Sequence, residues 1–128
     1  MLNTRDVLAV LLTLAFAASA VGAQTVEING GQTNVLLDTA TLSTAASLSL
    51  SSVSGDVIAP GNLGADSVAF GINARDAVSP LLATTFSYDP ADFLNTFAGT
   101  IEHAGSVFFN SDMVEVGNFT IGFDATRK

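Results

Sequence analysis

The chain has 128 residues, carries 12 Asp and Glu against 4 Lys and Arg, and contains no cysteine. Its net charge of −8 leaves too few cations to neutralise a phosphate backbone or to dock on anionic lipid, so nucleic acid and charged membrane surfaces are excluded as expected partners. The absence of cysteine excludes disulfides and, with a single histidine, a structural zinc site. Stability therefore has to come from the core, from a bound ion or from neighbouring molecules.

The N-terminal segment has the pattern of a secretory signal peptide. An apolar run of about a dozen residues follows Arg5 and gives way to small residues that end at Ala23. A membrane-spanning helix needs about 20 apolar residues, so this run is too short for an anchor. We expect residues 1–23 to form a signal-peptide helix that is cleaved after Ala23, or after Ala20, and that meets the membrane only transiently. Residues 24–128 then form one small domain.

The remaining sequence is rich in Gly, Ser, Thr, Val and Phe, and its apolar residues alternate over short stretches between turn-forming residues. This pattern is typical of strands in an all-β domain. Asp38 is placed to cap a short helix over Thr39–Ala46. Asp89 and Pro90 are typical of the start of a helix, which predicts one helical turn over Asp89–Asp92. The predicted strands of this part are Thr25–Ile28, Thr33–Leu37, Ser47–Val53, Ser67–Ile72 and Leu81–Tyr88.

The last third of the sequence predicts a long β-hairpin. Apolar residues occupy alternate positions over Phe97–Phe109, and a return strand is predicted over Met113–Phe123. The alternation of the return strand changes phase near Gly117 and Asn118, which predicts a β-bulge at that point. Taken with the earlier strands, this hairpin predicts an antiparallel β-sandwich with one or two short helices.

Residues typical of catalysis are scarce. His103 is the only histidine, and no G-x-S-x-G nucleophile motif occurs. A Ser-His-Asp triad therefore has no support beyond this single side chain. On the strand face that it shares with Ile101 and Phe109, His103 is expected to be a hydrogen-bonded, half-buried residue rather than a base. We predict that the protein is not an enzyme and has no resident cofactor.

Two groups of acidic residues offer oxygen ligands of the kind that calcium prefers. Asp89 and Asp92 lie in one predicted turn, and Asp112 and Glu115 lie around the predicted hairpin. Neither group matches the D-x-[DN]-x-[DN]-G calcium loop, and Asp is also an ordinary turn residue. Calcium binding at these four residues is therefore a secondary alternative.

Two stretches near the C-terminus resemble bacterial exported proteins of the PEP-CTERM type. They run from Phe97 to Asn110 (F-A-G-T-I-E-H-A-G-S-V-F-F-N) and from Val116 to Asp124 (V-G-N-F-T-I-G-F-D), and a looser similarity covers Asn34–Pro60. Proteins of this type are surface or extracellular-matrix proteins that are sorted through a C-terminal signal and share no enzymatic activity. The chain lacks their Val-Pro-Glu-Pro-like motif, apolar helix and basic tail, so the domain is expected to be either truncated at its C-terminus or freely released.

A second, weaker similarity is to HtaA-type haem-uptake domains, whose stretches of the form G-T-[IV]-x-[HY]-x-G-x-V-x-F match Gly99–Phe109. That resemblance implies haem ligation by Tyr88 and His103, and histidine is a common haem ligand. The sequence as a whole predicts an exported bacterial surface or extracellular protein with a structural or interaction role and an unknown extracellular or cell-surface partner. The alternative is a ligand-binding module for haem or calcium.

Overall fold

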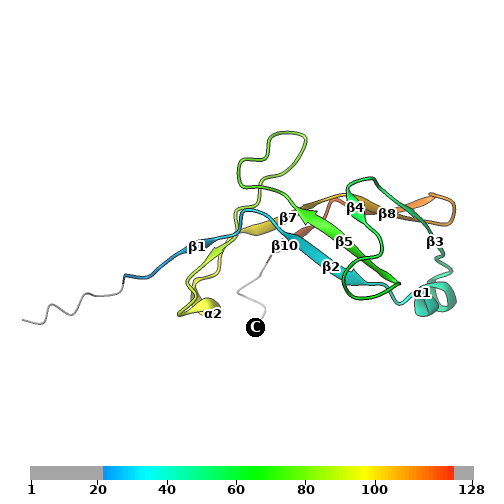
Figure 1. The fold of residues 1–128 in the computed structure, drawn as a ribbon, viewed down its shortest axis with the longest axis horizontal. Coiled ribbons are helices and arrows are strands. Elements are labelled where there is room, and N and C mark those ends of the chain that lie inside the picture. The colour runs from blue at the N-terminus through cyan, green and yellow to red at the C-terminus, as the bar shows by residue number, and fades with distance from the viewer. Residues whose placement is uncertain (1–21, 123–128) are drawn as a thin grey trace, which may run out of the picture.

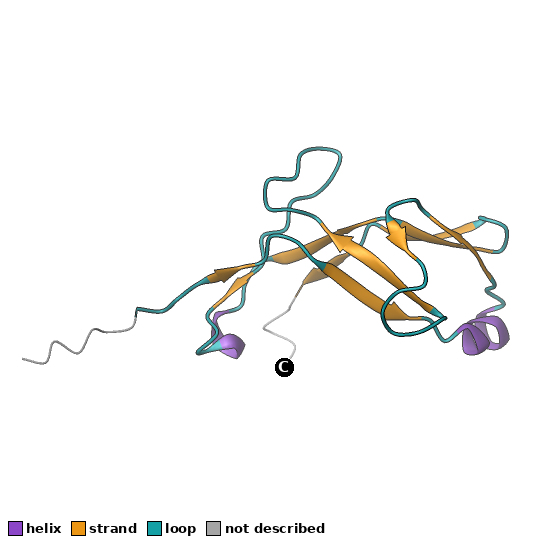
Figure 2. Cartoon of the chain, in the orientation of Figure 1, coloured by secondary structure: helices purple, strands orange, loops and turns teal. Residues whose placement is uncertain are grey.

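Residues 22–122 are described by a computed structural model, and within them the chain forms antiparallel sheets with two short helices. The predicted all-β, sandwich-like fold class is therefore confirmed. The predicted signal-peptide helix lies outside the described residues. The molecule is elongated, with the two helices at opposite ends and the sheets between them (Figures 1 and 2).

The chain alternates short strands with two helices. The helices are α1 (Thr39–Ala46) and α2 (Phe93–Thr96). The strands are β1 (Val26–Glu27), β2 (Gln32–Leu36), β3 (Leu50–Val53), β4 (Val57–Ile58), β5 (Ser67–Ile72), β6 (Ser87–Tyr88), β7 (Thr100–Ala104), β8 (Ser106–Phe109), β9 (Val114–Gly117) and β10 (Thr120–Gly122).

Strand β5 organises the larger sheet because it is paired along both edges. β2 pairs with one edge of β5, whereas β4 and β7 share the other edge and β7 pairs onward with β10. A second sheet has the order β3-β8-β9, and a two-stranded ribbon joins β1 to β6. All of these pairings are antiparallel, as the sequence predicts.

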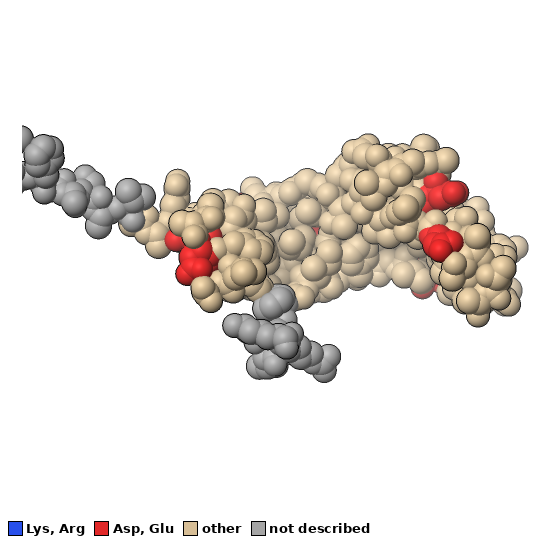
Figure 3. Space-filling view, turned by 90° about the horizontal axis from the view of Figure 1, so that it is seen from below, with Lys and Arg blue, Asp and Glu red and all other residues tan. Residues whose placement is uncertain are grey.

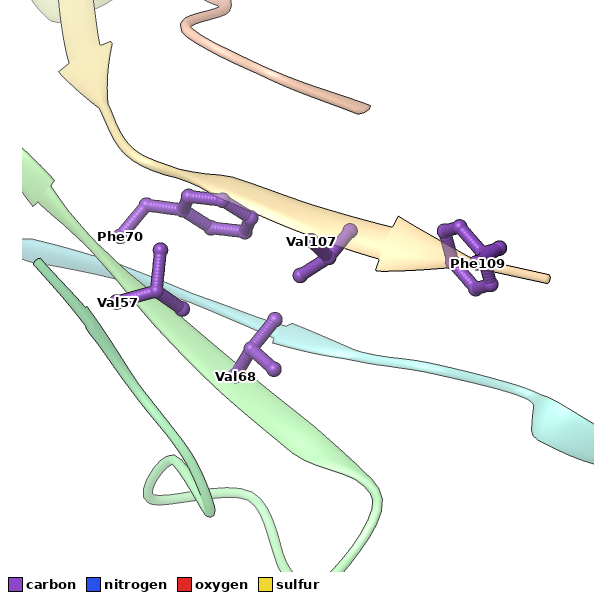
Figure 4. Close-up of a cluster of buried hydrophobic side chains, with 5 residues drawn as sticks. All are labelled: Val57, Val68, Phe70, Val107 and Phe109. Carbon is purple, nitrogen blue, oxygen red and sulfur yellow. The ribbon is translucent and has the colours of Figure 1, made fainter. Parts of the chain in front are cut away.

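The two larger sheets face each other across a small apolar core (Figure 4). β4 and β5 contribute Val57, Val68 and Phe70, and β8 contributes Val107 and Phe109. Each of these residues is at most 6% exposed. Residues two apart on a strand point to the same face. Val68 and Phe70 on β5 therefore both face the second sheet, and Val107 and Phe109 on β8 both face the first.

Helix α1 covers one end of this core. Asp38 caps its N-terminus, as predicted, and its carboxylate accepts a hydrogen bond of 2.9 Å from the amide of Thr41. The helix ends where Ser47 adopts a left-handed conformation with a φ of 54°, and Leu48 then donates its amide to the carbonyl of Leu42. Leu42 within the helix and Leu48 just beyond it both pack against the core, and these contacts fix the position of the helix.

The long strand predicted over Phe97–Phe109 is wrong in its continuity. It is divided into β7 and β8 at Gly105, whose φ of 96° favours glycine and lets the chain pass from one sheet to the other. The return strand is likewise divided into β9 and β10, and Phe123 lies outside the described residues. The bulge predicted near Gly117 and Asn118 of the return strand is wrong in its strand, because residues 103–105 lie opposite Asn118 and Phe119 between the two ladders. The extra residue belongs to the outgoing strand.

The strand predicted over Leu81–Tyr88 is also wrong in its extent. Only its last two residues form a strand, β6, because the amides of Thr85 and Phe86 both donate to the carbonyl of Thr100 instead of forming a regular ladder. Strand β4 was not predicted, since two residues are too few to show an alternation. The remaining strands β1, β2, β3 and β5 lie within their predicted ranges or within one residue of them.

The predicted helical turn is displaced along the chain. Over Asp89–Asp92 the chain forms a hydrogen-bonded turn, in which the amide of Asp92 donates to the carbonyl of Asp89 at 3.1 Å. Helix α2 begins only at Phe93, with Asp92 at its N-cap position but without a side-chain capping hydrogen bond. The Asp-Pro pair therefore begins a turn rather than a helix, because Asp and Pro favour both structures.

Candidate functional site

His103 lies on β7 and is buried, with 3% of its surface exposed. Its Nε2 lies 2.7 Å from the hydroxyl of Thr33, and its Nδ1 lies 3.2 Å from the carbonyl oxygen of Phe119. The imidazole also stacks on the ring of Phe119 at a centroid distance of 4.3 Å, and Phe119 packs edge-on against Phe70 of the core. His103 is therefore hydrogen-bonded, as predicted, and more deeply buried than expected. It closes one end of the core.

Glu102 precedes His103 and is also buried, at 7% exposure. Its Oε2 accepts a hydrogen bond of 2.5 Å from the hydroxyl of Thr120 on β10, and its amide donates to the hydroxyl of Thr84 at 3.1 Å. Hydrogen bonds from Thr120 and Thr100 hold the pKa of the Glu102 carboxyl below its ordinary value, and the charge of His103 acts in the same direction against the opposing effect of burial. The carboxylate is therefore ionised at neutral pH.

Glu102 and His103 line a small cavity of about 150 Å³ that has both polar and apolar walls. Asn73 links two parts of the cavity wall by hydrogen bonds. Its backbone amide donates to the carbonyl of Glu102 at 2.8 Å, and its side-chain amide donates to the carbonyl of Leu82 at 2.9 Å. Leu81 and Leu82 are 46% and 64% exposed, so one wall is apolar and open to water. They belong to the loop between β5 and β6, which stands out from the body of the molecule (Figure 1). The remaining lining residues are Pro80 and Asn118.

Tyr88, the other haem candidate, lies in a separate aromatic cluster. Its ring packs against Phe86 and Phe93 at centroid distances of 6.1 and 5.1 Å, and Phe93 stacks on Phe97 at 5.2 Å. The ring contacts and hydrogen bonds of His103 described above involve none of these residues. The structure therefore does not bring Tyr88 and His103 together, and both ring nitrogens of His103 already have partners.

The aromatic cluster opens into an apolar groove of about 240 Å³. Phe93, Leu94 and Ile121 are 45%, 77% and 43% exposed, so the groove faces water. Among the described strands β10 is the last of its sheet, which leaves its outer backbone edge unpaired there. An exposed apolar groove beside an open strand edge is typical of a protein-binding surface. The lining residues are Phe86, Phe93, Leu94, Phe97, Ile101, Ile121 and Gly122.

The calcium candidates next to α2 hold local turns. Asp89 accepts a hydrogen bond of 2.8 Å from the amide of Ala91 through its carboxylate. Asp92 accepts one of 2.7 Å from the side-chain amide of Asn95. These contacts are the ordinary use of Asp in turns and at helix starts, and they account for both carboxylates without a metal.

The calcium candidates near the β8–β9 hairpin bind to different hydroxyls. Asp112 accepts a hydrogen bond of 2.8 Å from Ser52 on β3, and Glu115 accepts one of 2.6 Å from Ser106 on β8. Within residues 22–122 no three His, Cys, Asp or Glu side chains come together in a way that could hold a metal ion. Calcium binding at these positions stays a prediction of the sequence.

The described surface is strongly acidic. Residues 22–122 contain ten carboxylates and one strong base, Arg75, which forms an ion pair with Glu27 at 3.3 Å. On the face drawn in Figure 3 the acidic side chains gather toward both ends of the molecule, one of which carries α2 and β1. A partner that meets either end therefore encounters negative charge.

Sequence reasoning did not find the cavity or the groove. The alternation along the strand puts Thr100 and Glu102 on the same polar face. This shared face is the one feature of the sequence that points to a site at the Glu102 carboxylate. An acid at such a position is usually exposed, whereas Glu102 is buried and lines a cavity with Leu81 and Leu82, which lie about twenty residues away in the sequence. The groove likewise needs β6, α2 and β10 to meet, which no local pattern encodes.

Comparisons of the chain with family models, with curated proteins and with solved structures found no match. Of the helices that the structure describes, none has the length and apolar character needed to cross a lipid bilayer. The features of the chain that bear on function are therefore the cavity, the groove and the net charge.

Proposed function

We propose that the chain is an exported bacterial surface or extracellular domain without catalytic activity, and that it works by binding another protein. The observation that carries this proposal is the apolar groove beside β10. Within residues 22–122 the core cluster consists of five buried side chains, whereas Val78, Leu94 and Met113 are 76%, 77% and 84% exposed. A domain that leaves this much apolar surface in water is suited to association.

We further propose that the groove receives an extended segment of a partner, with apolar side chains flanked by Lys or Arg. The apolar lining suits apolar side chains, and the open edge of β10 suits backbone pairing with an added strand. Asp92 directly precedes Phe93 of the groove, and Asp89 lies in the same turn, so a basic flank meets complementary charge. A second copy of this chain would bring its own net charge of −8, which disfavours self-association at this surface.

A synthetic peptide, acetyl-Lys-Val-Thr-Val-Thr-Val-Lys-amide, provides a direct probe. Titrated into the ¹⁵N-labelled protein, it is expected to give saturable shifts at the amides of Thr120–Gly122, and added salt should weaken the binding. Ile121→Asp places a charge in the groove and is expected to lower the affinity by about tenfold or more. Val114→Asp is the matched control, because Val114 is a 37% exposed residue on the edge strand of the other sheet.

Three results would contradict the groove assignment. The first is an equal loss of affinity in the two variants. The second is full affinity for a peptide in which Glu replaces both lysines. The third is a dimer of the chain alone, seen by sedimentation and dissociated by Ile121→Asp, since that result assigns the groove to a second copy.

Export is tested independently of the groove. When the full chain is expressed in a Gram-negative host, the exported protein is expected to begin at Gln24, or at Val21 if cleavage follows Ala20. N-terminal sequencing of the periplasmic and secreted fractions measures this directly. A chain that stays in the cytoplasm with residues 1–23 intact contradicts export.

A further inference from the structure

Glu102 is a buried charge for which the described part of the chain supplies no Lys or Arg. Arg75 is the one such residue in residues 22–122, and it pairs with Glu27 at 3.3 Å and donates to the carbonyl of Phe86 at 3.1 Å. The hydroxyls of Thr120 and Thr100 donate hydrogen bonds to the Glu102 carboxylate, and His103 is the basic side chain beside it. The carboxylate stays ionised and its residue lines a cavity, so this position favours a positively charged ligand.

The cavity next to Glu102 has the size and lining for a small amphipathic cation. Its volume of about 150 Å³ equals the space of about five water molecules, well below the roughly 300 Å³ at which drug-sized pockets begin. The lining includes one acidic residue, Glu102, together with Asn73 and Asn118. Leu81 and Leu82 add an exposed apolar wall. A charged end beside an apolar wall matches a cation carried on a short hydrocarbon stem.

We propose that this cavity binds a primary ammonium group on a short alkyl chain, supplied by a free alkylamine or by a lysine side chain of another protein. The ammonium pairs with the Glu102 carboxylate, and the alkyl stem lies along Leu81 and Leu82. An ammonium fits better than a guanidinium, because the Glu102 carboxylate already accepts from Thr120 and Thr100 and cannot offer both oxygens to a planar fork.

Butylammonium chloride titrated into the ¹⁵N-labelled full chain tests the site. We expect saturable shifts at the amides of Asn73, Glu102 and Asn118, and an affinity about tenfold or more weaker in Glu102→Gln, which keeps the shape of the side chain and removes its charge. Glu115→Gln is the matched control, because the Glu115 carboxylate also accepts from a hydroxyl, at 2.6 Å, but does not line the cavity. It is expected to bind butylammonium as the unaltered protein does.

Further ligands separate the contributions of charge and stem. Leu82→Ser is expected to weaken butylammonium but not methylammonium, and this comparison holds even if Glu102→Gln fails to fold. Acetyl-lysine-methylamide identifies the source: binding at least as tight as butylammonium assigns the site to a lysine of a partner, and weaker binding assigns it to a free amine. The proposal is overturned by non-saturable shifts, by equal affinity for butanol, or by unchanged affinity in Glu102→Gln with its fold intact.

Discussion

Two regions of the molecule treat their apolar side chains differently. Between the two larger sheets, the chain closes over Val68, Phe70 and Phe109, each at most 4% exposed. Near α2, Phe93 and Phe97 stack at 5.2 Å, yet Phe93 stays 45% exposed and the cluster opens into a groove. Close packing concentrates stability in the first region, and open packing leaves surface for binding in the second. This difference between the two regions can be tested by mutation, and the largest effect is expected on the free energy of unfolding.

Phenylalanine truncation in the two regions should have very different costs. Phe70→Ala removes a 3% exposed ring that contacts Phe119, and we expect it to lower the free energy of unfolding by about 3–5 kcal/mol. Phe93→Ala removes a ring that is already half in water, and we expect a loss of about 1 kcal/mol. Urea unfolding followed by circular dichroism measures both values.

The same two variants should show the reverse order in binding. Phe93→Ala is expected to weaken the Lys-flanked peptide, since Phe93 lines the groove. A peptide affinity that falls only when stability falls would show that the groove is an extension of the core. Similar unfolding losses in Phe70→Ala and Phe93→Ala would lead to the same conclusion.

The elements that sequence predicts well are those whose determinants are local. Asp38 caps α1 and Leu42 is an apolar residue within it, and the observed range of the helix equals the predicted one. Val68 and Phe70 alternate within β5, which is also found over its predicted residues. In both cases the capping group or the apolar pattern lies inside the element, so no distant contact is needed to specify it.

The elements that sequence predicts poorly depend on distant partners. Gly105 fits a continuous strand by alternation, but a Cβ there would meet Val57 at 2.5 Å, so the break between β7 and β8 is set by the packing of β4. Leu81 and Leu82 suggest a strand, yet they serve as an exposed wall of the cavity. Neither the cavity nor the groove is formed by one segment of the chain. This is why His103 could be named as a candidate residue from the sequence, whereas the cavity beside Glu102 could not be predicted.

The smallest expected effect separates the two helices through their capping aspartates. Asp38 accepts from the amide of Thr41 at 2.9 Å, whereas Asp92 makes no capping hydrogen bond to the backbone of α2. Asp38→Ala should therefore lower the melting temperature by a few degrees at pH 7, and Asp92→Ala by less. Differential scanning calorimetry of both variants provides the measurement, and an equal or larger effect at Asp92 would contradict the difference in capping.

The pH dependence of the Asp38 effect identifies the charged cap as its cause. The backbone hydrogen bond from Thr41, followed by its hydroxyl, lowers the pKa of Asp38 below the ordinary value of 3.8. A carboxyl whose pKa is lower in the folded state adds stability above its unfolded pKa and loses it as the pH falls through the folded value. The deficit of Asp38→Ala should therefore be constant from neutral pH down to about pH 5 and shrink below about pH 4. Asp38→Asn keeps a neutral cap, so its stability relative to Asp38→Ala should not change over that range. A deficit that persists unchanged in acid would mean that the helix end depends on packing rather than on the ionised cap.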